Sequence, residues 1–135
     1  MLSAETFSNT RIFMFAVTGL ACLSYAIMAL ITGNPEPFSG WIPGGLGIMS
    51  GVVLWATGAV AGDANTERAM DEGYYADSAR AQQIAFWVAI FMYPAFSVPL
   101  ALDLIDLAVV FPAMGTLTGA TFLLLFVWFD LRGRM

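Results

Sequence analysis

The chain has 135 residues and a mean hydropathy of +0.78. Only 11% of its residues are charged, whereas a soluble domain usually carries about 25%. The net charge is −5, and histidine and lysine are both absent. These features exclude a histidine-ligated haem or metal, a Ser/His/Asp triad and a basic surface for nucleic acid. The one cysteine, Cys22, excludes an internal disulfide. Such a composition is typical of an integral membrane protein, whose partner is the lipid bilayer.

The first apolar run extends from Ile12 to Ile31 and ends at the sequence TGNPEP. Glycine, asparagine and two prolines stop a helix there, which places the first membrane span at about 12–32. Residues 19–22 loosely resemble a lipoprotein cleavage site after a signal peptide. Because residues 23–31 stay apolar beyond the cysteine, the sequence favours a retained span.

The second run, 41–61, contains the sequence GGLGIMSGVVLWATGAVAG. Five of its glycines fall within a stripe of about 60° when successive residues are set about 100° apart. Such a groove lets another helix backbone approach closely. The neighbour is either a helix of the same bundle or another subunit, and the sequence leaves both open. The glycines are Gly44, Gly47, Gly51, Gly58 and Gly62.

Residues 62–82 form a charged connection, expected in the cytoplasm, and its part 67–80 holds six of the chain's fifteen charges. The charge either resists transfer into lipid or forms a docking surface for a protein partner. The spacing matches neither an EF-hand nor a phosphate-transfer motif, so no catalytic or metal site is expected. We expect a helix break at Gly73, a new helix capped by Asp77 or Ser78, and an Asp77–Arg80 pair. The six charged residues are Glu67, Arg68, Asp71, Glu72, Asp77 and Arg80.

The chain shares three short motifs with a group of known sequences: Asp71-Glu72, Ala79-Arg80-Ala81 and Ala85-Phe86-Trp87. In these motifs it resembles small uncharacterised bacterial four-span membrane proteins with an acidic cytoplasmic loop between two helical hairpins. The match covers about 20 residues, and Gly73 stands where that family usually carries a basic residue. The resemblance implies a topology and no activity.

From Ile84 to Phe129 the chain carries only two charges, Asp103 and Asp106. A straight helix of this length would measure about 69 Å, roughly twice the bilayer core, so the chain must fold back. We place spans at about 83–102 and 108–129. The two aspartates form either a hydrated turn, with Asp106 capping the last helix, or an ion path.

Prolines and glycines mark the last two spans. Pro94 and Pro99 are expected to kink the third span. Gly115 and Gly119 form a second small-residue pair in the fourth.

The arginines set the orientation. With four spans, all five lie on one side of the membrane, which the positive-inside rule assigns to the cytoplasm together with both termini. They are Arg11, Arg68, Arg80, Arg132 and Arg134. Trp41, Trp87 and Trp128 lie near predicted span ends, as interfacial anchors do, whereas Trp55 lies in the middle of a span and is expected to serve packing.

The sequence therefore predicts an all-α fold, a single four-helix membrane domain over residues 1–135, built as two hairpins. We expect no cofactor, no metal and no enzymatic activity, since the spans offer nucleophiles without a recognisable base. The expected role is a non-catalytic accessory or structural subunit in a bacterial inner membrane, packing with itself or with a larger complex. The alternative is a small oligomeric transporter or channel that uses Asp103 and Asp106.

Overall fold

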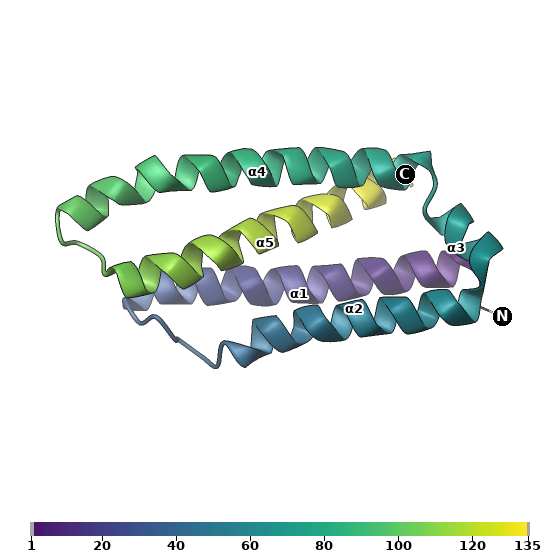
Figure 1. The fold of residues 1–135 in the computed structure, drawn as a ribbon, viewed down its shortest axis with the longest axis horizontal. Coiled ribbons are helices and arrows are strands. Elements are labelled where there is room, and N and C mark those ends of the chain that lie inside the picture. Colours follow the sequence, from purple (N-terminus) through teal and green to yellow (C-terminus); the bar gives the residue numbers. More distant parts are fainter. Residues whose placement is uncertain (1, 135) are drawn as a thin grey trace.

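In the computed structural model, residues 2–134 are described and all regular structure among them is α-helical. Four helices are long and apolar enough to cross a membrane, which is consistent with an integral membrane protein. A fifth, short helix connects the second and third of them (Figure 1). The helices are α1 (Ala4–Thr32), α2 (Trp41–Ala61), α3 (Asp63–Ala69), α4 (Glu72–Ala101) and α5 (Leu107–Gly133).

The first helix is longer than the apolar run that predicts it. It begins at Ala4 because the Ser3 side chain caps it, accepting a hydrogen bond from the Thr6 amide, with Glu5 in the first turn. It ends at Gly33, which has φ +66°, a left-handed conformation that favours glycine. By contrast, α2 has the same bounds as the predicted second span.

The charged connection is mostly helical, and its break lies earlier than expected. The chain leaves helical geometry at Met70, where φ is −109° and ψ is 50°. Asp71 then caps α4 by accepting a hydrogen bond from the Tyr74 amide. The expected break at Gly73 and cap at Asp77 or Ser78 are therefore wrong: a suitable capping carboxylate already stands at Asp71, and Gly73 is tolerated in the first turn.

The fold-back occurs at residues 102–106. One continuous helix, α4, contains both Pro94 and Pro99 and ends at Ala101. Asp103 has φ 52°, a left-handed conformation that aspartate tolerates better than most residues. Asp106 caps α5 through the Ala108 amide, as the sequence suggested.

The long helices lie in a row in the order α2, α1, α5, α4 (Figure 1). The most extensive contact joins α1 to α5, while α2 packs on α1 and α4 packs on α5. The first and last helices therefore form the centre. Small residues permit this approach, since a Cβ added at Gly19 would lie 2.9 Å from the Leu124 side chain.

The outer helices present large apolar side chains away from the row. In α2, Trp55 is 77% exposed, so the described residues of this chain do not supply the packing expected of it. A water-soluble protein rarely exposes so much apolar surface, whereas acyl chains solvate it readily. The buried Thr18 hydroxyl makes two polar contacts from α1 to α2, a 2.8 Å hydrogen bond with the buried Ser50 hydroxyl and a 3.4 Å hydrogen bond donated to the Leu46 carbonyl.

Candidate functional site

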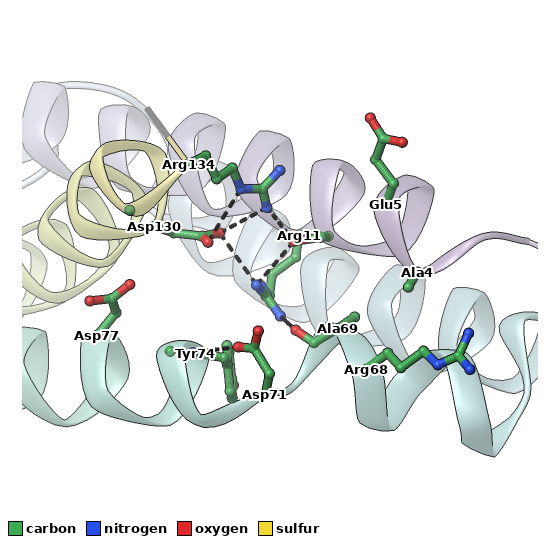
Figure 2. A pocket seen from close by; sticks show the side chains of 13 residues that line it. Ala4, Glu5, Arg11, Arg68, Ala69, Asp71, Tyr74, Asp77, Asp130 and Arg134 are labelled. Atoms are coloured by element: carbon green, nitrogen blue, oxygen red, sulfur yellow. Dashed lines mark hydrogen bonds and ion pairs between the residues drawn. The ribbon is translucent and has the colours of Figure 1, made fainter.

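A buried polar cluster lies at the end of the row where α1 begins, α5 ends and α3 lies (Figures 1 and 2). We call it the Arg11 cluster; it comprises Ser8, Arg11, the Ala69 carbonyl, Asp130 and Arg134. Helix α1, helix α5 and its C-cap residue Arg134 supply the side chains, and the last residue of α3 supplies the carbonyl. It thus joins residues more than 100 positions apart in the sequence.

Arg11 is at the centre of the cluster and is only 2% exposed. Its Nη1 donates to the Ala69 carbonyl at 2.9 Å. Its Nη2 donates to the Ser8 hydroxyl at 3.2 Å and to Asp130 Oδ2 at 3.3 Å. A guanidinium suits this place because its several N–H groups can reach acceptors on three helices at once.

Aromatic rings cover the faces of the guanidinium. Its carbon lies 4.3 Å from the centre of the Tyr74 ring and 5.3 Å from that of Phe126. The two rings meet edge to face, with centroids 5.5 Å apart. Ring faces attract a cation and exclude water, so the charge of Arg11 is held beside two aromatic side chains. Arg11 Nε has no hydrogen-bond partner among the described residues.

Asp130 is shared between two guanidiniums. Arg134 donates through Nε to Oδ1 at 3.4 Å and through Nη2 to Oδ2 at 3.2 Å. Arg134 also donates through Nη1 to Asn9 Oδ1 at 2.8 Å and through Nη2 to the Ser8 hydroxyl. The side chain of Asp130 is 13% exposed and that of Arg134 is 35% exposed, so the pair lies between the buried Arg11 and water.

A cavity of about 350 Å³ adjoins the cluster (Figure 2). Asp71 and Asp77 line it from α4 and its cap, whereas Glu5 and Arg68 point away from the cluster. No group of three acidic, histidine or cysteine side chains within residues 2–134 is arranged to hold a metal. The cavity is lined by three arginines, of which Arg11 and Arg134 are hydrogen-bonded to protein acceptors. The cluster therefore clamps α1, α3 and α5 together more than it offers free groups to a ligand.

The predicted docking residues are divided between α3, the α4 cap and α4. Glu67 and Arg68 lie in α3, and Asp71, as the cap, separates them from Glu72. Arg80 does not pair with Asp77 as expected. Its guanidinium carbon lies 4.9 Å from the Phe129 ring centre, because α5 passes beside this part of α4. The ion pairs formed by the described residues are Arg11–Asp130 and Arg134–Asp130.

Most of the predicted packing glycines face open space. A Cβ added at any of Gly44, Gly47, Gly51, Gly115 or Gly119 would meet nothing within 4 Å. Gly62 is also open, and its φ of +79° ends α2. Only Gly58 meets a neighbour, a Phe7 ring carbon at 3.4 Å. Contacts within the chain therefore do not account for the stripe on α2.

The two aspartates of the fold-back turn lie at the opposite end from the Arg11 cluster. Asp103 and Asp106 are exposed and, with the end of α1, line a cavity of about 410 Å³. Asp106 is engaged as the cap of α5.

Sequence reasoning missed three residues that matter here: Gly19, Arg11 as a buried group and Asp130 as its partner. The available signal was an arginine near the start of the first apolar run and an aspartate near the end of the last one. With an even number of spans, both fall at the same depth. No known protein family, curated protein or solved structure matches the chain, so its chemistry must be argued from its own residues.

Proposed function

We propose that this chain is a non-catalytic integral membrane subunit that packs through the glycine face of α2 against a second copy or a larger membrane complex. Its two helical hairpins, α1–α2 and α4–α5, span a bacterial inner membrane. Both termini and residues 62–82 lie in the cytoplasm, where all five arginines gather.

One observation carries this proposal: Gly44, Gly47 and Gly51 share a face of α2 that no residue between 2 and 134 covers. Glycine is a poor helix former, costing about 1 kcal/mol relative to alanine. Three on one helix face therefore call for a compensating contact. In lipid that contact is the close approach of another helix backbone, because apolar side chains gain little by leaving acyl chains.

The polar groups support a structural role. The Arg11 cluster uses its charges to hold helices of the same chain together. The charged faces of α3 and the start of α4 remain exposed, so they are suited to contact the cytoplasmic part of a partner.

Co-purification with two different tags tests the proposal. In native membranes the protein should be isolated with a fixed stoichiometry, either as a self-oligomer or with a partner. Gly47→Leu should abolish that association. Gly45→Leu is the matched control, since Gly45 is also open but points about 100° away from Gly44 on the helix. Equal association in both variants, or a monomer in the wild type, would overturn the proposal. A self-oligomer with an ion flux that Asp103→Asn abolishes would indicate transport instead.

Single cysteines test the orientation in a Cys22→Ser background. In intact cells a membrane-impermeant maleimide should label Asp103→Cys and spare Glu67→Cys until the cells are opened. Labelling of Glu67→Cys in intact cells would invert the proposed topology.

A further inference from the structure

The four long helices are not level with one another along the row. Figure 1 shows that α2 lies furthest toward the end with α3, whereas α4 extends furthest toward the fold-back turn. Side-chain contacts fix these positions, so the middle of each apolar run can be placed relative to α1. The runs are the expected spans 12–32, 41–61, 83–102 and 108–129, and their middles lie near Cys22, Gly51, Tyr93 and Thr118.

The middle of the α2 run lies level with the first half of α1. The Ser50 hydroxyl is hydrogen-bonded to Thr18, and a Cβ added at Gly58 would meet the Phe7 ring at 3.4 Å. Because both helices rise by about 1.5 Å per residue, these contacts place Gly51 level with about residue 16 of α1.

The α4–α5 hairpin fixes the position of α4 against α5. It closes between Ala101 and Leu107, and the Arg80 guanidinium lies over the Phe129 ring. At the same rise per residue, Tyr93 in the middle of the α4 run lies level with about residue 115 of α5.

Contacts between α5 and α1 complete the comparison. Arg11 pairs with Asp130, and a Cβ added at Gly19 would meet the Leu124 side chain. Residue 115 of α5 is therefore level with about residue 27 of α1. The middles of the α2 and α4 runs are thus about eleven residues, or about 16 Å, apart along the row.

An upright row, with every helix along the bilayer normal and the middle of α1 at the midplane, would misplace both polar and apolar groups. The Pro35 carbonyl accepts a hydrogen bond from Tyr25, so the exposed Glu36 would lie inside the hydrocarbon layer. Trp55, which is 77% exposed and lines a cavity with Arg11, would lie at the cytoplasmic surface. Both positions are unfavourable, because a carboxylate loses its hydration in lipid and an apolar ring is better solvated by lipid than by water.

We propose that the row lies obliquely in the bilayer, tilted by about 30° within its own plane. The angle follows from an offset of about 16 Å across three helix spacings of about 8–10 Å each, and membrane helices commonly tilt by about 0–40°. The tilt brings the middle of each apolar run to the midplane, leaves residues 33–40 outside the hydrocarbon and returns Trp55 to lipid. The surface that meets lipid is then an oblique belt around the row. This inference rests on the membrane insertion within the proposed function and is independent of the association through α2.

Three native tryptophans distinguish the two placements. In the oblique row Trp55, Trp87 and Trp128 lie about 6, 9 and 14 Å from the midplane, measured along their helices. In the upright row Trp87 lies within about 2 Å of the midplane, Trp128 about 12 Å and Trp55 about 16 Å from it. Trp128 is the matched reference because its distance changes least, whereas Trp55 changes from the deepest to the shallowest of the three.

Single-tryptophan variants, in which phenylalanine replaces the other three tryptophans, provide the test. Each full chain is reconstituted in phosphatidylcholine vesicles whose acyl chains carry bromine either near the headgroup or near the methyl end. The ratio of fluorescence quenching by the two lipids reports depth and cancels differences in overall exposure. Trp55 should lie about 7 Å deeper than Trp128, with Trp87 between them. Far-ultraviolet circular dichroism shows whether each variant keeps its helices.

Spin labels provide a second measurement that leaves most of the tryptophans in place. Trp55→Cys and Gln83→Cys are labelled in a Cys22→Ser background, since both positions are exposed on the surface of the chain. In the oblique row position 83 lies about 14 Å from the midplane, against about 8 Å in the upright row. The label at position 55 should therefore be relaxed more strongly by oxygen, and the label at position 83 more strongly by a nickel complex in the water.

Each contrary result has a distinct meaning. A Trp55 shallower than Trp128, or reversed accessibilities of the two labels, would overturn the oblique placement and leave membrane insertion intact. Absence of quenching at every tryptophan would overturn both the placement and the insertion on which it rests. A chain that stays monomeric but shows the expected depths would contradict the proposed association and support the oblique placement.

Discussion

Replacing Asp130 by asparagine tests the Arg11 cluster directly. The substitution keeps the shape of the side chain and removes the charge shared by Arg11 and Arg134. The side chain of Arg11 is only 3% exposed, so water cannot replace the lost counter-charge. Removing one partner of a buried ion pair costs about 3–5 kcal/mol, whereas the more exposed Arg134 contact adds less than about 1 kcal/mol. We therefore expect the free energy of unfolding to fall by about 3–5 kcal/mol.

The double variant Arg11→Met/Asp130→Asn separates pairing from general damage. With the guanidinium gone, no unpaired buried charge remains, so the double variant should be no less stable than Asp130→Asn. The coupling energy between the two positions should be about 1.5–3 kcal/mol, the range for a hydrogen bond to a charged group.

Unfolding is measured by titrating sodium dodecyl sulfate into the protein in a mild detergent, with far-ultraviolet circular dichroism as the readout. The control is Arg132→Met, because the Arg132 side chain is exposed and takes part in neither ion pair. This substitution should change the free energy of unfolding by no more than about 0.5 kcal/mol. Two results would refute the assignment of a buried, energetically coupled pair. One is a loss of less than about 1 kcal/mol in the free energy of unfolding of Asp130→Asn. The other is that the losses caused by Arg11→Met and Asp130→Asn sum, within about 0.5 kcal/mol, to the loss in the double variant.

The same titration checks three further predictions. Gly19→Ala should destabilise by about 1–3 kcal/mol, because the new methyl group meets Leu124 at 2.9 Å and the core is overpacked; Gly115→Ala, in open space, should cause no loss. Thr18→Val should cost about 0.6 kcal/mol, and at most about 1.7, by removing the hydroxyl contact with Ser50. Asp106→Ala should cost about 1 kcal/mol through loss of the α5 cap, and Asp106→Ser should restore most of it.

A different result would contradict each of these three predictions. Equal costs at the two glycines would mean that α1 and α5 do not approach closely. A neutral Thr18→Val would mean that the hydroxyl contacts of Thr18 with Ser50 and the Leu46 carbonyl do not hold α2 on α1. An Asp106→Ser variant as unstable as Asp106→Ala would show that the carboxylate acts there by something other than capping.

Features encoded over short distances could be predicted from the sequence. The second helix begins and ends at the residues expected, because glycines stand on both sides of one apolar run. The cap at Asp106 follows from an aspartate placed just before an apolar segment. Hydropathy locates the apolar part of α1 but not its start at Ala4, because the capped turn before Arg11 is polar and helical at once.

Which face of each helix meets the protein could not be predicted. In a soluble protein the apolar face marks the core, but in a membrane helix every face is apolar and that signal is lost. Gly19 and Gly44 therefore look alike in sequence, although only Gly19 lies against another helix. The Arg11–Asp130 pair spans 119 positions, so no local pattern could connect its members.

The order of the helix row has a consequence for biosynthesis. Because α1 leaves the ribosome first and its main neighbour α5 follows roughly 100 residues later, α1 enters the bilayer without the contact that fills most of its protein-facing side. Until Asp130 is translated, the Arg11 guanidinium lacks the carboxylate with which it pairs. The centre of the row can therefore form only after the last helix has been synthesised.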